Sequence, residues 1–223
     1  MYIPRSFLMS EQDAVQFVAE HPFAVLFSTT RDGEPLATHL PLVRRDDGRL
    51  VGHLARANPH WRHLDGARVL AVFLGPHAYI SPEWYGAMPN VPTWNYVTVH
   101  ATGTCRLLTG QDQLAEALAV LTRFIEPSSP IPDAVLRPTH PDHAYYQAEM
   151  PAIVGFSIDV ERLEGKAKLG QNRTRAERKG AQAGLFATGD PDARAVAECM
   201  RATLRDDASW CGREGGGPEN PSP

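Results

Sequence analysis

Residues 51–103 hold most of the aromatic side chains that also carry a polar group. Five of the nine histidines and three of the four tryptophans lie in this stretch. A core that served only to support a sheet would consist mainly of Val, Ile, Leu and Phe. Aromatic rings with polar edges at predicted strand ends indicate instead a pocket for a flat ligand with a polar rim. The residues are His53, His60, His63, His77, His100, Trp61, Trp84 and Trp94.

The segment Gly52–Pro59 could bind a phosphate. A predicted strand ends there, Arg56 follows, and Asn58-Pro59 begins a short predicted helix. Free N–H groups at a helix start and a guanidinium fork both suit phosphate oxygens. An ordinary helix cap beside a surface arginine accounts for the same residues. Neither GxGxxG nor GxxxxGK[ST] occurs in the sequence.

Two predicted strands could contact an aromatic ligand. Thr38–Leu42 has a proline inside an apolar run, which indicates an edge strand or bulge whose free main-chain groups could bond the edge of a heteroaromatic ring. A plain edge strand is the alternative. Trp94, Tyr96 and His100 share one face of the second strand. They could form an aromatic wall for a cofactor, or cover one end of a barrel.

The run 162–179 is the one basic stretch of an acidic chain. It could bind phosphate or nucleic acid, although most such runs are solvated helix faces. The opposing residues are Glu164 and Glu177. The basic residues are Arg162, Lys166, Lys168, Arg173, Arg175, Arg178 and Lys179.

Metal and thiol chemistry are weakly indicated. The pairs His60/His63 and His140/His143 have helical spacing, but HExxH is absent, so surface histidines are expected. Cys105 lies on an apolar strand and is expected to be a buried, inert thiol.

Composition favours one cytoplasmic domain. The chain has 223 residues and a net charge of -4, which gives no overall attraction to nucleic acid. Three widely spaced cysteines favour a reducing compartment. The N-terminal residues lack the apolar segment of a secretory signal, and no apolar run is long enough to span a membrane.

The elements that position these residues are mainly strands. Asp32-Gly33 and Asp47-Gly48 are hairpin turns between β-rich runs and predict an antiparallel meander. Helices are predicted at 10–19, 58–64, 111–125, 173–185 and 190–204, a loop at 127–141, and a disordered tail at 206–223. Strands are predicted at 23–30, 36–44, 49–55, 68–74, 78–81, 94–107 and 153–160. The fold class is mainly β with peripheral helices (α+β), a small six- or seven-stranded barrel.

Five ordered motifs resemble the PaiB family of FMN-binding negative transcriptional regulators. They are MYIPRSF, GHLARANPHWR, FLGPHAYISPEWY, VPTWNYVTVH and KLGQNR. The resemblance implies an antiparallel split barrel, similar to flavin reductases and pyridoxamine-phosphate oxidases. It covers residues 1–205, read as one FMN-binding domain with a C-terminal helical decoration. It also implies a homodimer with the cofactor at the subunit interface.

The resemblance assigns roles to particular residues. Thr38, His39, Leu40 and Pro41, with His53, Leu54 and Ala55, would flank the flavin ring, and His39 and His53 would adjust its electronics. Arg56 and Asn58 would hold the phosphate, with Trp61 behind them. Trp94 and Asn95 would lie near the ring or the dimer seam. Lys168, Gln171, Asn172 and Arg173 would reach across from the partner subunit. Ala167 and Gly170 depart from the family pattern, which has an aromatic residue and a serine there.

Three other functions stay open at this stage. An FMN-dependent reductase or oxidase of a small molecule would need space over the ring, with the loop 82–92 as a lid. A haem-binding split-barrel relative would use one histidine as an axial ligand. A DNA-binding repressor would use the run 162–179. The leading expectation is an FMN-binding protein that acts as a regulator or as a flavin-responsive redox protein.

Overall fold

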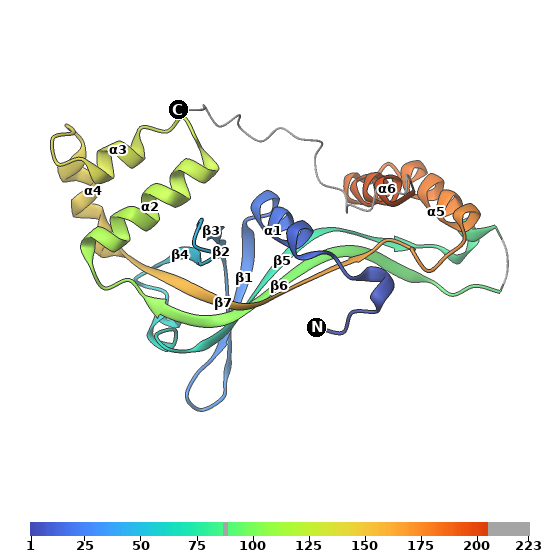
Figure 1. Ribbon diagram of the computed structural model, residues 1–223, viewed down its shortest axis with the longest axis horizontal. Coiled ribbons are helices and arrows are strands. Elements are labelled where there is room, and N and C mark those ends of the chain that lie inside the picture. Colours follow the sequence, from blue (N-terminus) through green and yellow to red (C-terminus); the bar gives the residue numbers. More distant parts are fainter. Residues whose placement is uncertain (87–88, 205–223) are drawn as a thin grey trace. The chain divides into compact units, whose positions relative to one another are not determined.

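A seven-stranded sheet forms the centre of the fold (Figure 1). The structure, a computed structural model, describes residues 1–86 and 89–204. The strand order is β2-β1-β5-β6-β7-β4-β3, with antiparallel pairing. The strands are β1 Phe23–Thr29, β2 Pro35–Pro41, β3 Val43–Arg44, β4 Leu50–Ala55, β5 Arg68–Ile80, β6 Thr93–Leu107 and β7 Ile153–Lys168. The prediction of six or seven antiparallel strands is confirmed.

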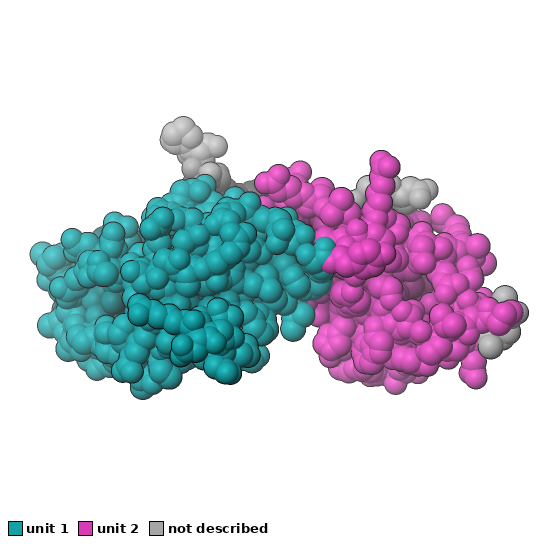
Figure 2. All heavy atoms as spheres, turned by 90° about the horizontal axis from the view of Figure 1, so that it is seen from below, with its two compact units in different colours: residues 1, 18–74, 98–164 teal, residues 2–17, 75–97, 165–223 magenta. Residues whose placement is uncertain are grey.

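The chain divides into two compact units, coloured separately in Figure 2. Unit 1 comprises residues 1, 18–74 and 98–164, and unit 2 comprises residues 2–17, 75–97 and 165–223. The boundary therefore falls within the long strands β5, β6 and β7. A single domain over residues 1–205 stays a prediction, and the predicted tail 206–223 lies outside the described residues.

Strand alternation gives β1 a buried face and an exposed face. Ala24 and Leu26 are buried, whereas Phe23 is 63% exposed and Phe27 is 38% exposed. Residues directly opposite in an antiparallel pair share a face. The exposed side is here called the outer apolar face, and it belongs wholly to unit 1. It consists of Phe23, Val25 and Phe27 of β1, Ala37, His39 and Pro41 of β2, and Leu70, Val72 and Leu74 of β5.

The predicted strand 36–44 is two strands, β2 and β3, which end and begin on either side of Leu42. The Leu42 N–H donates to the Pro22 carbonyl at 2.8 Å, a bond that continues the β1–β2 register by one pair. Leu42 itself is fully buried against β4. A Cβ at Gly52 would lie 2.7 Å from the Leu42 side chain and 3.2 Å from the Pro41 oxygen. Glycine at position 52 therefore allows the end of β2 to approach β4.

The helices differ from the predictions mainly between β6 and β7. The segment 127–141, predicted as a loop, contains α3, which begins after Pro130 with Pro132 in its first turn, where proline is tolerated. Helix α4 had no predicted counterpart. The helices are α1 Glu11–Glu20, α2 Gln111–Ile125, α3 Ile131–Leu136, α4 His143–Glu149, α5 Arg175–Ala187 and α6 Pro191–Leu204. The 3-10 helices are η1 Arg5–Phe7, η2 Pro59–His63, η3 Pro82–Tyr85 and η4 Met150–Ala152.

Two predicted strands are longer than expected. Strand β5 runs through Gly75-Pro76, where a break was predicted, and β7 continues eight residues beyond the predicted end at Val160 to Lys168. Among the described residues, no helix is both long enough and apolar enough to cross a bilayer.

Candidate functional site

A buried hydrogen-bond network connects three segments of unit 1. The ring of His60, on η2, is only 3% exposed. Its Nε2 lies 2.8 Å from Ser28 Oγ on β1, and its Nδ1 lies 2.7 Å from Thr38 Oγ1 on β2. Burial lowers the pKa of His60, and the nearby His63 lowers it further. A neutral ring donates from one nitrogen and accepts at the other, so one hydroxyl donates to the ring and the other accepts from it.

Asn58 joins this network as the cap of η2. Its side-chain oxygen accepts from the His60 N–H at 3.0 Å. Its Nδ2 donates to Thr38 Oγ1 at 3.2 Å. The Asn-Pro cap predicted from the sequence is therefore present, and it fixes η2 to the middle of β2. Thr38, Asn58, His60 and Ser28 are here called the hydroxyl–histidine network.

Arg56 ties β4 to the start of β7. Its Nε donates to the Pro151 carbonyl at 2.6 Å and its Nη2 to the Ile153 carbonyl at 2.9 Å. The guanidinium carbon lies 5.7 Å from the ring centroid of Trp61, whose Nε1 donates to the Arg56 carbonyl at 3.0 Å. Two of the five guanidinium N–H donors are thus used within the chain. Contact with a phosphate through the remaining donors stays a prediction.

Strand β2 lies at one end of the sheet order, as predicted for an edge strand. Its residues alternate between the two faces. Thr38 points to the interior network, and Leu40 is 4% exposed. His39 lies on the outer apolar face, with its ring stacked at 6.4 Å from that of Phe23, and Pro41 lies on the same face. An edge strand leaves main-chain groups free on one side, and these could bond a heteroaromatic ring edge.

His53 on β4 faces helix α2. It pairs with Gly155, whose Cβ position would lie 2.6 Å from a Leu114 methyl group of α2. Burial lowers the pKa of His53, and its Nδ1 is a buried atom without a hydrogen-bond partner among the described residues. Leu54 is buried on the opposite face and Ala55 is exposed. Contact of these residues with a flavin ring stays a prediction.

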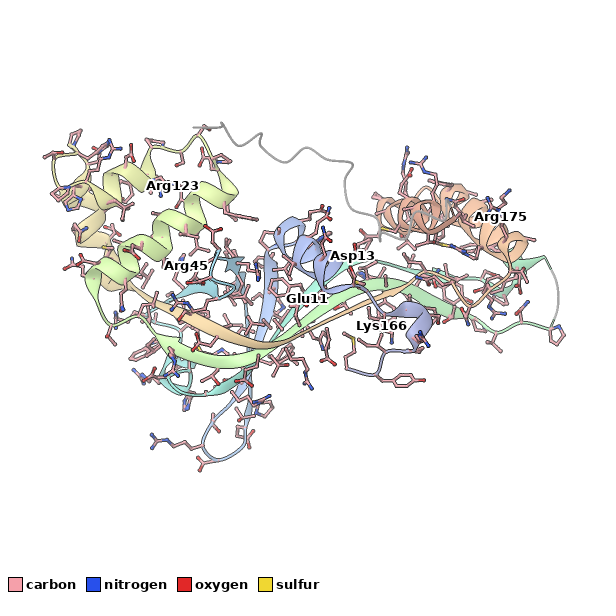
Figure 3. All side chains as sticks on the ribbon, in the orientation of Figure 1. Glu11, Asp13, Arg45, Arg123, Lys166 and Arg175 are labelled. Carbon is pink, nitrogen blue, oxygen red and sulfur yellow. The ribbon has the colours of Figure 1, made fainter. Side chains whose placement is uncertain are left out.

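Unit 2 holds a second polar group at the end of β7. The Lys168 ammonium donates to the Trp94 carbonyl at 2.7 Å and also to the Thr93 hydroxyl. Burial lowers the pKa of Lys168, and the neighbouring cations Lys166 and Arg173 lower it further. Lys166, labelled in Figure 3, is 8% exposed and lies 5.3 Å from the Tyr96 ring centroid.

The other predicted residues of unit 2 have mixed environments. Gln171 closes the turn after β7, because its side chain bonds the Ala167 oxygen at 2.7 Å and the Leu169 N–H at 2.8 Å. Asn172 is exposed. Arg173 lies over the Tyr85 ring at 4.5 Å and donates to Asn90 Oδ1 at 2.7 Å.

Two departures from the family pattern have structural consequences in this turn. Gly170 has a φ of +82°, a conformation that favours glycine over serine. Ala167, where an aromatic residue was expected, is buried at 5% exposure.

Trp94 and Asn95 lie on opposite faces of β6. Trp94 is 52% exposed, with its ring 6.2 Å from that of Tyr79 and 6.3 Å from that of His77. Asn95 is 2% exposed and bonds Met200 Sδ of α6 at 3.4 Å. Trp94 is therefore available to a partner or ligand, whereas Asn95 supports the packing of α6.

The sequence analysis missed Ser28 and misjudged His60. His60 was expected on the surface as half of an HxxH pair, and this was wrong, because β1 and β2 enclose it. The sequence signal that could have indicated its burial was its position two residues after the Asn58 cap, together with hydroxyl residues on two predicted strands. Cys105 is fully buried, as predicted, and burial raises its pKa to about 12.

The donor set of unit 1 fits the parts of FMN. The Thr38 hydroxyl, the Asn58 amide and the unused Arg56 donors suit phosphate oxygens. The open side of β2 offers main-chain groups to the polar edge of a ring.

Comparisons with known proteins agree with this description. A family model described as "Putative FMN-binding domain" matches residues 1–162. The protein "Protease synthase and sporulation protein PAI 2" of Bacillus subtilis is 38% identical over 212 residues, covering 92% of this chain and 99% of its own.

Solved structures of low identity show the fold. The flavocytochrome Anf3 of Azotobacter vinelandii has a TM-score of 0.55 at 18% identity, covering 74% of this chain and 72% of its own. The FAD and haem binding protein of Mycobacterium smegmatis has a TM-score of 0.54 at 20% identity, covering 72% of each chain. The predicted split barrel is confirmed, and the chain belongs to the PaiB-like family whose model is described as an FMN-binding domain.

Proposed function

We propose that this protein binds FMN between two copies of the chain and works as a flavin-responsive protein. The observation that carries the proposal is the hydroxyl–histidine network beside the open side of β2, within a chain of this family. Bound FMN supplies hydride or electron transfer. The residues of this chain bind, orient and shield it.

Thr38 is proposed to donate to the cofactor. When His60 donates from Nδ1, Thr38 Oγ1 accepts from both His60 and Asn58. The hydroxyl hydrogen of Thr38 is then free for an acceptor on FMN. Because the pKa of His60 is lowered by burial, the ring is neutral at pH 7 and can hold this arrangement.

The binding test uses quenching of FMN fluorescence. We expect Thr38→Val to weaken FMN binding by about tenfold, the effect of one lost hydrogen bond of about 1.4 kcal/mol. Thr104→Val is the matched control, since that hydroxyl bonds only an exposed carboxylate, that of Glu161, elsewhere in unit 1. Equal affinities for Thr38→Val and the control, with both variants folded, would refute the assignment.

Dimerisation is proposed through the outer apolar face. Phe23 and Leu74 are 63% and 58% exposed on neighbouring parts of that face. A contiguous exposed apolar surface commonly marks a protein–protein interface. In sedimentation velocity we expect a dimer for the native chain and a monomer for Phe23→Asp. A monomeric native chain that still retains FMN contradicts an interfacial site.

Lys168, Asn172 and Arg173 are proposed to act on the FMN bound by the partner subunit. Mixing subunits tests this directly. Consider a mixed dimer of one Asn58→Ala chain and one Lys168→Gln chain. If each site takes Asn58 from one chain and Lys168 from the other, one of the two sites has both native residues. If each site lies within one chain, neither site has both. We therefore expect about one tightly bound FMN per mixed dimer. Uniformly weak binding in the mixed dimer excludes the shared site.

Haem binding is a second candidate, and His39 favours it. This histidine is exposed on the outer apolar face beside Phe23, so an axial ligand and a flat apolar surface lie together. Haem titration of the native chain distinguishes the candidates. A Soret band that is lost in His39→Ala would identify haem, whereas flavin absorption with no Soret band identifies FMN.

A regulatory role is proposed to act through a partner rather than through the run 162–179. Several of these cations already have partners. Arg162 pairs with Glu164 at 3.3 Å, Arg173 pairs with Glu177 at 3.5 Å, and Lys166 is buried. A salt-dependent DNA affinity that falls in Lys179→Gln would refute this part of the proposal.

A further inference from the structure

A cavity lies in unit 1, between the turn that follows β3 and the C-terminal half of α2. Its volume is about 500 Å³, within the range of small-molecule sites. All the residues that line it belong to unit 1. None of them belongs to the hydroxyl–histidine network, so the cavity is independent of the proposed FMN site.

The floor of this cavity is apolar and well supported. Val43 is 2% exposed and packs with Val51 of β4 and Ala117 and Leu121 of α2. Val120 packs against the same cluster. Phe124, also on α2, is 39% exposed and lines the cavity. A ligand with an apolar body could therefore cover the exposed ring of Phe124.

Three arginines line the cavity together with this floor. Arg44 is the last residue of β3, Arg45 follows it, and Arg123 lies on α2, with Arg45 and Arg123 labelled in Figure 3. Arg45 Nε lies 3.7 Å from Asp47 Oδ2, and Arg123 Nη2 lies 3.8 Å from Asp133 Oδ1. These are long ion pairs between partly exposed groups and contribute little. The arginines keep most of their donors for another anion.

The carboxylates of the cavity do not cancel this charge. Asp46 and Asp47 line the cavity, but Asp47 is already bound by Arg49, which lies outside the lining. Asp47 Oδ2 accepts from Arg49 Nη2 at 2.6 Å and from Nε at 3.0 Å. These hydrogen bonds lower the pKa of Asp47 and keep it ionised. The lining therefore holds three arginines and two carboxylates, and one of these carboxylates, Asp47, also binds Arg49 outside the lining.

Backbone hydrogen bonds order the turn that carries Arg45. The Arg45 N–H donates to the Arg49 carbonyl at 2.8 Å, and the Gly48 N–H donates to the Arg45 carbonyl at 2.9 Å. Gly48 has a φ of +87°, which favours glycine, and the Arg44 guanidinium lies 3.3 Å from its Cβ position. The backbone of this turn is therefore ordered before a ligand arrives, which reduces the entropy lost on binding.

We propose that this cavity binds a small organic anion, a carboxylate carried on an aryl or alkyl body. The carboxylate would accept hydrogen bonds from the arginines, and the apolar body would lie on Phe124 and Val120. Arginine suits this role because its planar fork matches the two oxygens of a carboxylate.

The test titrates 3-phenylpropionate into the full-length ¹⁵N-labelled protein. We expect saturable amide shifts confined to residues 43–49 and 117–125, with a dissociation constant of about 1 to 5 mM for so small a probe. The neutral amide 3-phenylpropanamide has the same body without the charge and should bind at least about tenfold more weakly.

Variants separate the arginine site from general binding. Arg45→Gln and Arg123→Gln should each weaken 3-phenylpropionate binding by about tenfold. Arg106→Gln is the control, since Arg106 is an exposed arginine of unit 1 that pairs with Asp159 at 2.9 Å on another strand. Thermal melts confirm that each variant is folded. Equal affinity for the acid and the amide, shifts outside these segments, or no saturation overturns the proposal.

Discussion

Replacing His60 by Phe tests whether the hydroxyl–histidine network stabilises unit 1. Phenylalanine keeps a ring at a site that is 3% exposed, but it removes two hydrogen bonds, of 2.8 and 2.7 Å. Each bond contributes about 1 kcal/mol net. The Ser28 hydroxyl, 7% exposed, also loses its partner, which costs about 1 to 2 kcal/mol more. We expect the free energy of unfolding to fall by about 3 to 4 kcal/mol.

A double-mutant cycle in urea isolates the network from simple repacking. Adding Ser28→Ala to His60→Phe removes the orphaned hydroxyl, so the double variant should be about 1 to 2 kcal/mol more stable than the sum of the single effects predicts. His77→Phe, at an exposed histidine, should change stability by less than about 0.5 kcal/mol. Strict additivity between positions 28 and 60 would show that the two side chains do not act as a pair.

Three further predictions follow from burial and capping. The half-buried histidines His53 and His100 have pKa values lowered by desolvation, so the unfolded chain binds more protons below pH 6.5. The free energy of unfolding should fall as the pH drops below 6.5, by at most about 1.4 kcal/mol per pH unit for each histidine. Urea melts at several pH values measure this slope. If His53→Asn leaves the slope unchanged, the prediction is contradicted. Cys105 is fully buried and its pKa is raised to about 12, so it should resist iodoacetamide at pH 8 in the folded protein and react in denaturant. Mass spectrometry locates the modified cysteine. Rapid labelling of Cys105 in the folded protein would refute its burial. Thr174→Ala should cost about 1 kcal/mol, because Thr174 and Glu177 form the capping box of α5; an unchanged thermal midpoint would show that the cap is dispensable.

Local sequence patterns were sufficient to predict the elements whose structure depends on neighbouring residues in the chain. The Asp-Gly pairs identified two hairpin turns, and the apolar spacing identified α2. Asn58-Pro59 identified the start of η2. The proline-rich stretch before α4 misled the prediction, because prolines that cannot lie inside a helix can begin one.

The site depended on contacts that no local pattern records. His60 meets Ser28, which is 32 residues away in the sequence, and Arg56 meets Ile153, which is 97 residues away. The sequence showed a histidine and an arginine beside a predicted cap. It could not show that one would be enclosed and the other used to tie two strands.

The sequence by itself determined the family, the order in which the strands follow one another along the chain, and the residue types available to bind a phosphorylated flavin. Only the tertiary structure decided which of those residues are buried, which donors are already used, and that the β3–β4 turn and α2 together line a cavity that contains three arginines. The physical reason is that backbone propensities act over a few residues, whereas burial, hydrogen-bond partners and the free energy of charged groups depend on which distant segments pack together.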